Sequence, residues 1–184
     1  MQTDLWKMKQ AEVTKAEEGL LALLREQFGE AVTGHQKFAD QLSVTVAAEI
    51  IFELARFMKE EEAAGFELLS DICGVDWINR PEHRFELVYN FYSVKKNLRV
   101  LVRTTIPDGE APSIRSIQPV YPGADWLERE VYDMLGIDFE GHPDLRRIIT
   151  PDGLEGWPHR KDFPLMYEAP QFSYNKDLPP EIVK

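Results

Sequence analysis

The sequence predicts an α+β fold, in which a largely antiparallel sheet has helices packed on one face and is followed by an extended, irregular C-terminal tail. Helical and strand-like hydrophobic patterns succeed each other along the first 135 residues. Consecutive strand-like runs are joined by connections too short for crossover helices, which favours antiparallel pairing. Seven of the twelve prolines lie between Pro143 and Pro180. We therefore expect a globular domain over residues 1–139 and a proline-rich docking tail over residues 140–184.

The first expected helix covers residues 14–28. Thr14 and Glu17 have the spacing of a capping box, and Gly29 is placed where a helix usually stops. Apolar side chains recur at helical spacing between these signals, so one face of the helix should be buried. These side chains are Leu20, Leu23, Leu24 and Phe28.

A strand and a helix are expected next, followed by three strands. Residues 42–46 alternate between apolar and polar, and residues 50–58 then change to helical spacing. The three later strands are expected around residues 66–72, 85–91 and 98–104, with turn-forming residues separating them. The residues that indicate these strands are Phe66, Leu68 and Ile72, then Phe85, Leu87, Tyr89 and Phe91, then Leu98, Val100, Val102 and Thr104.

The last expected helix runs from Trp126 to Leu135. Asp125 and Glu128 have capping-box spacing, so Asp125 should cap the helix and Glu128 should lie near its positive end. A stripe of apolar residues follows at helical spacing, and Gly136 is placed to end the helix in the left-handed conformation.

The tail beyond this helix has no hydrophobic periodicity. Each of its prolines removes a backbone donor and disfavours helix at the residue before it. An irregular segment with few apolar residues cannot easily offset the cost of ordering it, about 1–2 kcal/mol per residue. We therefore expect the tail to lie on the surface of a partner.

Composition limits the classes of function. A chain of 184 residues that is 43% hydrophobic can bury one ordinary core. Its net charge of -11 repels phosphate backbones and anionic lipid, so we expect neither nucleic-acid binding nor electrostatic membrane attachment. The N-terminus lacks the apolar run of a signal peptide, and no stretch approaches the roughly 20 apolar residues of a membrane span. We expect a soluble cytoplasmic polypeptide whose partners are proteins.

Cys73 is the only cysteine, which excludes an internal disulfide and a four-cysteine iron–sulfur cluster housed within this chain. We expect a buried structural thiol; the alternative is a nucleophile, which would need a histidine close by in space. No glycine-rich phosphate loop of the dinucleotide or P-loop kind occurs. The sequence therefore predicts no binding of NAD, flavin or nucleotide by this chain.

A metal site is a weak alternative in the tail. Glu140, His142 and Asp144 supply carboxylate and imidazole groups, but their spacing matches no recognised metal pattern. Gly141 and Pro143 instead indicate a tight turn whose polar side chains bond to nearby backbone.

Two carboxylates of the last helix could suggest acid–base chemistry. Glu130 and Asp133 lie three residues apart on the predicted helix. Carboxylates on an exposed helical face are usually solvated and transfer no protons, so we expect both to face water.

The positive charges of the tail indicate an interface. Arg146, Arg147, Arg160 and Lys161 lie among glycines and prolines in an otherwise acidic chain. Because a guanidinium matches the geometry of a carboxylate, we expect these side chains to pair with acidic groups of a partner. The alternative is a solvated tail with weak surface ion pairs.

These residues also carry a family resemblance. The segment from Glu128 to Arg147, EREVYDMLGIDFEGHPDLRR, together with RKDFP at residues 160–164, closely resembles the signature of the 30 kDa-subunit family, the C subunit of NADH:quinone oxidoreductase or respiratory complex I. Upstream, LLSDICGVDW, RFELVYNFYS and LRVLVRT look like the sheet of the same family, so the resemblance covers about residues 66–165. Relatives commonly have a histidine before Pro158 and a leucine after it, which leaves the role of His159 open.

The resemblance implies a non-redox accessory subunit in the peripheral arm of a proton-translocating enzyme. Such a subunit docks on the large D subunit, which helps to form the quinone site, and supports electron transfer from NADH to quinone. FMN and iron–sulfur clusters are then expected in partner subunits and no cofactor in this chain. The expected location is the cytoplasmic face of the bacterial inner membrane, reached only through the complex.

Two other functions stay open. One is the equivalent subunit of a membrane-bound hydrogenase or of a ferredoxin- or F₄₂₀-dependent dehydrogenase. The other, more remote, is a metal-dependent hydrolase that uses the three metal-ligand candidates of the tail.

The resemblance and the residue patterns together give the candidate docking residues. These are Glu128, Arg129, Glu130, Tyr132, Asp133, Gly136, Gly141, His142, Pro143, Asp144, Arg146, Arg147, Arg160, Lys161, Asp162, Phe163 and Pro164.

Overall fold

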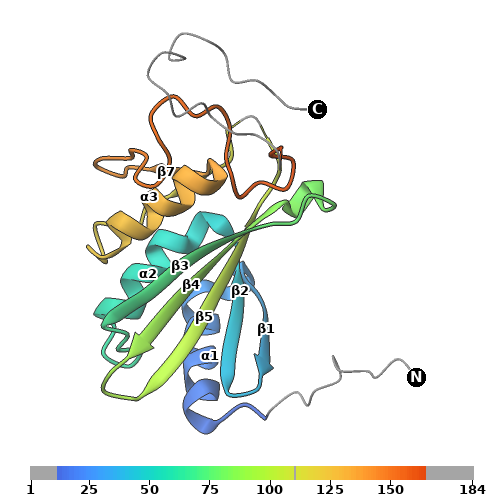
Figure 1. The fold of residues 1–184 in the computed structure, drawn as a ribbon. Coiled ribbons are helices and arrows are strands. Elements are labelled where there is room, and N and C mark those ends of the chain that lie inside the picture. The colour runs from blue at the N-terminus through green and yellow to red at the C-terminus, as the bar shows by residue number, and fades with distance from the viewer. Residues whose placement is uncertain (1–11, 110, 165–184) are drawn as a thin grey trace, which may run out of the picture.

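A five-stranded sheet with helices on one face forms the body of the molecule (Figure 1). The computed structural model describes residues 12–109 and 111–164. The helices are α1 (Lys15–Phe28), α2 (Ile51–Glu60) and α3 (Ala124–Leu135), with short 3-10 turns at Gly29–Ala31, Ala48–Ile50 and Pro81–His83. The strands are β1 (Val32–Phe38), β2 (Gln41–Val46), β3 (Leu68–Asp76), β4 (Phe85–Ser93), β5 (Leu98–Ile106), β6 (Ser113–Arg115) and β7 (Asp138–Glu140).

The strand order of the large sheet is β1-β2-β5-β4-β3. Every neighbouring pair is antiparallel except β2 with β5, which is parallel. A separate parallel pair joins β6 to β7. The prediction of an α+β fold with a largely antiparallel sheet is confirmed.

Strand β1 is an edge strand that the hydrophobic pattern did not reveal. Its sequence, VTGHQKF, has no apolar alternation, and Lys37 is its one buried side chain. The Lys37 ammonium lies 2.7 Å from the Glu17 carboxylate of α1. Glu17 also completes the predicted capping box by accepting from the Thr14 backbone N–H at 2.7 Å. An ion pair therefore replaces apolar packing where this strand meets α1.

A bulge in β3 changes which side chains face the core. The register with β4 shifts between Leu69 and Asp71, so one extra residue separates the two halves of the strand. Leu69 is buried and Leu68 is 48% exposed. Leu68 therefore does not share the core-facing side of Ile72, which strict alternation of apolar residues could not anticipate.

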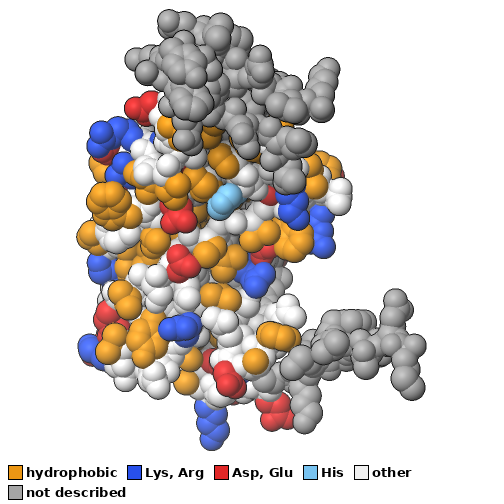
Figure 2. All heavy atoms as spheres, in the orientation of Figure 1, with side chains coloured by type: hydrophobic (Ala, Val, Ile, Leu, Met, Phe, Trp, Pro, Cys, Tyr) orange, Lys and Arg blue, Asp and Glu red, His pale blue; other side chains and the backbone are white. Residues whose placement is uncertain are grey.

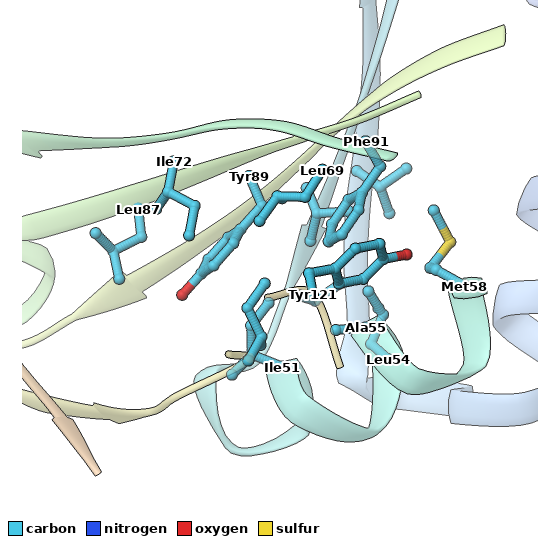
Figure 3. Packing of buried hydrophobic residues seen from close by; sticks show 14 of the residues in the cluster. Ile51, Leu54, Ala55, Met58, Leu69, Ile72, Leu87, Tyr89, Phe91 and Tyr121 are labelled. Atoms are coloured by element: carbon cyan, nitrogen blue, oxygen red, sulfur yellow. The ribbon is translucent and has the colours of Figure 1, made fainter. Parts of the chain in front are cut away.

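The core lies between the sheet and the helices (Figure 3). Side chains of α2 face those of β3 and β4, and Tyr121 fills the space between them, donating its hydroxyl to the carbonyl of Phe66 at 2.7 Å. Helix α3 reaches β3 at Gly74, where an added Cβ would lie 2.2 Å from Leu135 Cδ1. The residues labelled in this view are Ile51, Leu54, Ala55, Met58, Leu69, Ile72, Leu87, Tyr89, Phe91 and Tyr121.

Helix α3 begins at Ala124, before the predicted Trp126, and no side chain caps it. Asp125 lies inside the first turn, so the predicted capping box with Glu128 is wrong: that carboxylate turns into the protein and bonds elsewhere. Gly136 ends the helix as predicted, with φ 68° and ψ 35°, and its N–H donates to the Tyr132 carbonyl at 2.8 Å.

Cys73 is exposed, so the prediction of a buried thiol is wrong. In β3 the preceding Ile72 faces the core, and alternation turns Cys73 to the other face of the sheet. Partial desolvation and the neighbouring Asp71 carboxylate raise the pKa of the thiol to about 11. The thiol form dominates near neutral pH, which does not favour a nucleophile.

No helix within residues 12–109 and 111–164 combines the length and the apolar character that crossing a bilayer requires. The N-terminal residues considered for a signal peptide lie outside the described part of the chain.

Candidate docking site

The segment that follows β7, residues 141–164, lies against α3 and is called the strap here (Figure 1). Neither helix nor strand occurs in it, as its prolines predict. The predicted division of the chain between residues 139 and 140 falls inside β7, where Phe139 pairs with Ile114 of β6. The division of the chain into a globular domain and a docking tail stays a prediction.

Asp133 of α3 anchors the strap. Its buried carboxylate accepts the backbone N–H groups of Ile148, Ile149 and Thr150 at 3.0, 2.7 and 2.9 Å, and the Thr150 hydroxyl as well. Burial alone would raise the pKa of Asp133, but these hydrogen bonds hold it below its ordinary value. The prediction that Asp133 faces water is wrong, because the strap folds over it; Glu130 is exposed as predicted.

Arg147 holds the strap from its own side. Its guanidinium donates to Asp133 Oδ1 at 3.4 Å and to the Gly156 carbonyl at 3.1 Å, and lies 4.5 Å from the centroid of the Trp157 ring. Trp157 packs edge-on against Tyr132 of α3, with 5.3 Å between ring centroids. The strap is therefore fixed to α3 by both an ion pair and aromatic contact.

The end of α3 is enclosed by the strap. A Cβ added at Gly136 would lie 2.3 Å from Trp157 Cε2, so this position requires glycine for space as well as for its left-handed backbone. Arg160 donates to the carbonyls of Leu135 at 2.6 Å and Gly136 at 3.3 Å. These are carbonyls that a helix end leaves without intrahelical partners.

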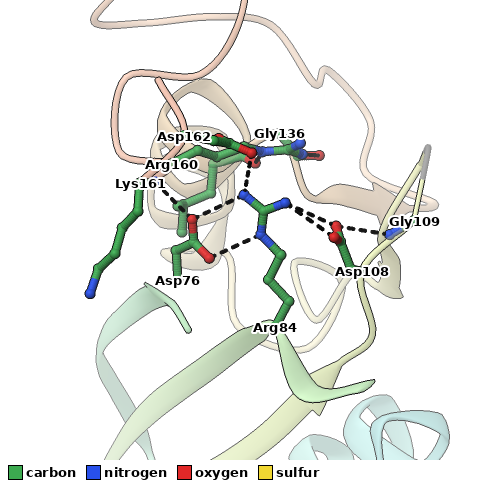
Figure 4. Close-up of polar contacts among 9 residues, drawn as sticks. Asp76, Arg84, Asp108, Gly109, Gly136, Arg160, Lys161 and Asp162 are labelled. Carbon is green, nitrogen blue, oxygen red and sulfur yellow. Dashed lines mark hydrogen bonds and ion pairs between the residues drawn. The ribbon is translucent and has the colours of Figure 1, made fainter. Parts of the chain in front are cut away.

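A buried arginine joins the end of the strap to the sheet (Figure 4). Arg84 precedes β4 and donates to Asp76 at 3.0 and 3.2 Å, to Asp108 at 3.1 Å and to Asp162 of the strap at 2.6 Å. The Lys161 backbone N–H donates to Asp76 at 2.8 Å. Burial would raise the pKa of Asp76, but Arg84 and this N–H hold it below its ordinary value. The arrangement closes the strap onto the sheet.

Sequence reasoning missed Asp76, Arg84 and Asp108. Opposite charges near the ends of two successive strands, Asp76 and Arg84, are a usable signal for a hairpin ion pair. The other contacts of Arg84 reach residues 24 and 78 positions away, which no local pattern encodes.

His142 is buried against the first turns of α3. Its Nδ1 accepts from the Asp144 N–H at 3.1 Å, so its Nε2 carries the proton and faces the Asp125 carbonyl at 3.3 Å. The same nitrogen lies 3.9 Å from Glu128 Oε2, and both side chains are fully buried. Here the predicted tight turn is confirmed: Gly141 has φ 84°, and the His142 N–H donates to the Phe139 carbonyl at 3.0 Å.

The metal-site candidates have other partners. Glu140 accepts from the Ser113 hydroxyl at 2.9 Å, and Asp144 accepts from Arg146 at 2.6 Å. Among the residues that the structure describes, no group of three or more His, Cys, Asp or Glu side chains is placed to hold a metal ion. The hydrolase alternative therefore gains no support from the geometry.

Glu128 has a strongly shifted pKa. Its carboxylate accepts from the Ser116 hydroxyl at 2.5 Å and the Ile117 N–H at 2.7 Å. Burial raises the pKa of Glu128 to about 7, with these two bonds opposing the rise and the charge of Asp125 adding to it. Near neutral pH the side chain is therefore partly protonated inside the protein.

We expect Glu128→Gln to remove a pH dependence of stability. The folded-state pKa of about 7 exceeds the ordinary value, so the stabilisation from Glu128 is complete below about pH 4.3 and is lost as pH rises through 7. Urea unfolding at pH 5 and pH 8 should show the wild type losing about 2 kcal/mol more than the variant. Glu130→Gln, at an exposed position, is the control and should follow the wild type. Parallel losses in wild type and Glu128→Gln would contradict the assignment.

The structure divides the candidate docking residues into a bonded group and a surface group. Buried or half-buried are Glu128, Arg129, Tyr132, Asp133, Gly136, His142, Arg147, Arg160 and Phe163. Exposed are Glu130, Gly141, Pro143, Asp144, Arg146, Lys161, Asp162 and Pro164. Most of the first group joins α3 to the strap, whereas Glu128 bonds to Ser116 and Ile117. The second group lies at the surface, although Asp162 also pairs with Arg84.

Comparison with known proteins identifies the family of this fold and strap. The model of the family described as respiratory-chain NADH dehydrogenase, 30 Kd subunit, matches residues 44–169. The chain belongs to this family. The resemblance noted in the signature segment is thereby confirmed, and the partners of the chain are other subunits of the NADH-quinone oxidoreductase complex.

Curated relatives agree with this family. The chain is 47% identical over 146 residues to the C subunit of NADH-quinone oxidoreductase from Sinorhizobium medicae, covering 79% of this chain and 71% of the relative. It is 42% identical over 152 residues to the C subunit of the same enzyme from Hyphomonas neptunium, covering 83% and 74%.

Two solved structures share the fold. A trypsin-resistant fragment of Nqo5, residues 1–134, is 33% identical with a TM-score of 0.57 and covers 68% of this chain and 98% of the fragment. A chain of the membrane-bound sulfane sulfur reductase, an archaeal respiratory membrane complex, is 31% identical with a TM-score of 0.69, covering 81% and 86%.

Proposed function

We propose that this chain is a non-redox structural subunit in the peripheral arm of a proton-translocating NADH:quinone oxidoreductase, at the cytoplasmic face of the inner membrane. It docks on the large D subunit through α3 and the strap, and so supports electron transfer to quinone. The observation that carries this proposal is the fixed strap: Asp133, Arg147 and Arg160 bond inside the chain, so the exposed side chains between them are held in place. A surface ordered before binding loses less entropy on docking.

We further propose that FMN and the iron–sulfur clusters of the complex are held by its other subunits. Family membership supports this, as does the single cysteine of the sequence, since a cluster with four cysteine ligands needs more. On this proposal the chain positions other subunits and takes no part in the redox steps.

A second candidate is the equivalent subunit of a related respiratory machine with another electron donor. The fold similarity to a chain of an archaeal respiratory membrane complex favours keeping it. The two candidates differ in one measurable property, the oxidation of NADH by the purified complex.

Arg146→Glu tests the docking surface. The Arg146 side chain is 72% exposed and pairs with Asp144, its near neighbour, so reversing its charge should leave the fold intact. We expect about tenfold less of the tagged chain to be recovered with the large subunit from gently solubilised membranes. The introduced glutamate would face the acidic groups that are expected to pair with Arg146, and like charges buried at an interface repel. NADH-to-quinone activity of the eluate should fall in proportion.

Arg56→Glu is the matched control, because Arg56 lies on α2 and its side chain is 53% exposed. It should be recovered like the wild type. Arg147→Glu is not a clean test, since it would also break the bonds of the strap. Unchanged recovery of Arg146→Glu would exclude Arg146 from the interface, and a wild-type eluate without the large subunit would refute the proposed function.

A further inference from the structure

An exposed tryptophan lies at the start of α3. Trp126 is 63% exposed, whereas Trp157 of the strap is half-buried and Trp77 is 37% exposed. A tryptophan left in water forgoes the burial of a large apolar surface. Trp126 was predicted to start the helix but is not among the candidate docking residues. Its ring does not belong to the hydrophobic core.

A guanidinium is held beside this ring. Arg129 lies with its guanidinium carbon 5.1 Å from the centroid of the Trp126 ring, and its Nε donates to the Arg146 carbonyl of the strap at 3.2 Å. Arg129 is only 7% exposed. Among the described residues its two terminal nitrogens have no acceptor and neither nitrogen is fully buried, so they are the part of Arg129 that can donate to a partner. Arg146 supplies a second guanidinium close by, whose charge Asp144 and Asp152 offset in part. Two guanidinium groups therefore lie next to an exposed aromatic ring in a chain of net charge -11.

A second hydrophobic side chain lies along the same side of α3. Ile149 is 60% exposed, and its backbone N–H donates to Asp133 of α3. Asp133 follows Trp126 by seven residues. Seven residues are about two helical turns, so Trp126 and Asp133 share one side of α3 at a spacing of about 10 Å. Figure 2 shows hydrophobic and Lys or Arg side chains next to each other over the N-terminal part of α3, at the left of the view.

We propose that Trp126, Arg129, Arg146 and Ile149, here the anchor patch, form the centre of the docking surface and bind a protein segment of a partner subunit in which a carboxylate is flanked by apolar side chains. The carboxylate accepts from Arg129 and Arg146, and its apolar neighbours cover Trp126 and Ile149. Tryptophan and arginine are enriched among the few interface residues that contribute most to binding, and a desolvated guanidinium selects a carboxylate. The inference rests on the proposed function and names the chemistry of the partner.

A protein fits this patch better than a membrane. An exposed tryptophan beside arginines could also meet anionic lipid headgroups. The net charge of -11 opposes approach to an extended anionic surface, whereas one carboxylate on a protein needs to approach only the two guanidinium groups.

Trp126→Ala in the full-length chain, expressed in place of the native copy, is the test. We expect about tenfold less of the tagged chain to be recovered with the large subunit, since truncating a central aromatic residue has an effect of this size. Trp126→Phe keeps an aromatic surface and should restore most of the recovery. Phe38→Ala is the matched control, because Phe38 is an aromatic residue, 56% exposed, at the end of β1. Thermal melting of each purified variant should match the wild type.

The outcomes separate this inference from the proposed function. If Arg146→Glu lowers recovery and Trp126→Ala does not, the anchor patch is wrong and the docking function stands. If the wild type itself is not recovered with the large subunit, both fall. Flotation of the purified wild type with phosphatidylglycerol vesicles, lost in Trp126→Ala while subunit recovery is unchanged, would assign the patch to a membrane and overturn the inference.

Discussion

Asp133→Ala should release the strap from α3. The substitution removes the acceptor of the Ile148, Ile149 and Thr150 amides and the ionic partner of Arg147. Hydrogen bonds to a charged group contribute about 1.5–3 kcal/mol each and do not add fully, so we expect a local loss of about 3 kcal/mol. Hydrogen exchange of these three amides should then accelerate about 100-fold.

The control for this experiment is Glu130→Ala, which removes an exposed carboxylate from the same helix. It should leave exchange in the strap unchanged. The strap amides must lose protection in Asp133→Ala while amides of the central strand β5 keep it. Slow exchange at Ile148 to Thr150 in the variant would show that other contacts hold the strap.

Arg84→Met should destabilise the whole domain. Methionine keeps most of the apolar volume but leaves Asp76, whose side chain is almost fully buried, without its cation. Breaking a buried ion pair by removing one partner costs about 3–5 kcal/mol, so urea denaturation at pH 7 should show a loss of this size. The same variant frees Asp162 and so loosens the end of the strap.

The pH dependence of stability tests whether the unpaired Asp76 carboxylate causes the loss in Arg84→Met. In the wild type the depressed pKa of Asp76 stabilises the folded state above the ordinary aspartate pKa, and this contribution is lost as pH falls. In Arg84→Met the buried carboxylate keeps the Lys161 N–H and the charge of Arg160 but loses its paired guanidinium, so its pKa should rise and the defect should shrink toward pH 4. Asp76→Asn added to Arg84→Met should recover part of the stability. Arg56→Met, which breaks an exposed pair on α2, should cost less than about 1 kcal/mol.

Local signals predicted most of the regular structure. The Thr14 and Glu17 capping box and Gly29 bound α1, and Gly136 ends α3, because the groups that satisfy a helix end lie within a few residues of it. Strand β4 shows strict alternation and buries every residue that its pattern predicts. Strand β1, which was not predicted, shows the limit of such patterns. Backbone pairing with β2 and the ion pair between Lys37 and Glu17 hold it in place, so its sequence has no alternation of apolar residues.

The signature segment shows the same limit at the site. The sequence indicated a candidate docking region but treated Glu130 and Asp133 alike, since both are carboxylates of one helix. Only the folded strap distinguishes them, because it covers Asp133 and leaves Glu130 in water. The capping role given to Glu128 was wrong for a similar reason, since the carboxylate meets Ser116 and Ile117 from outside the helix.

The sequence by itself determined the fold class, both ends of α1, the C-terminal end of α3, the family and the irregular course of the tail, because hydrophobic period, capping groups and proline act over a few residues. The tertiary structure decided which charges are bonded and which are exposed. Arg84 bonds to residues 76, 108 and 162, which lie far apart in the sequence. Arg146 and Arg147 are adjacent in the sequence, yet Arg146 is exposed and Arg147 is half-buried. These differences depend on which distant segment covers each side chain and excludes water from it, and burial of that kind exists only once the chain has folded.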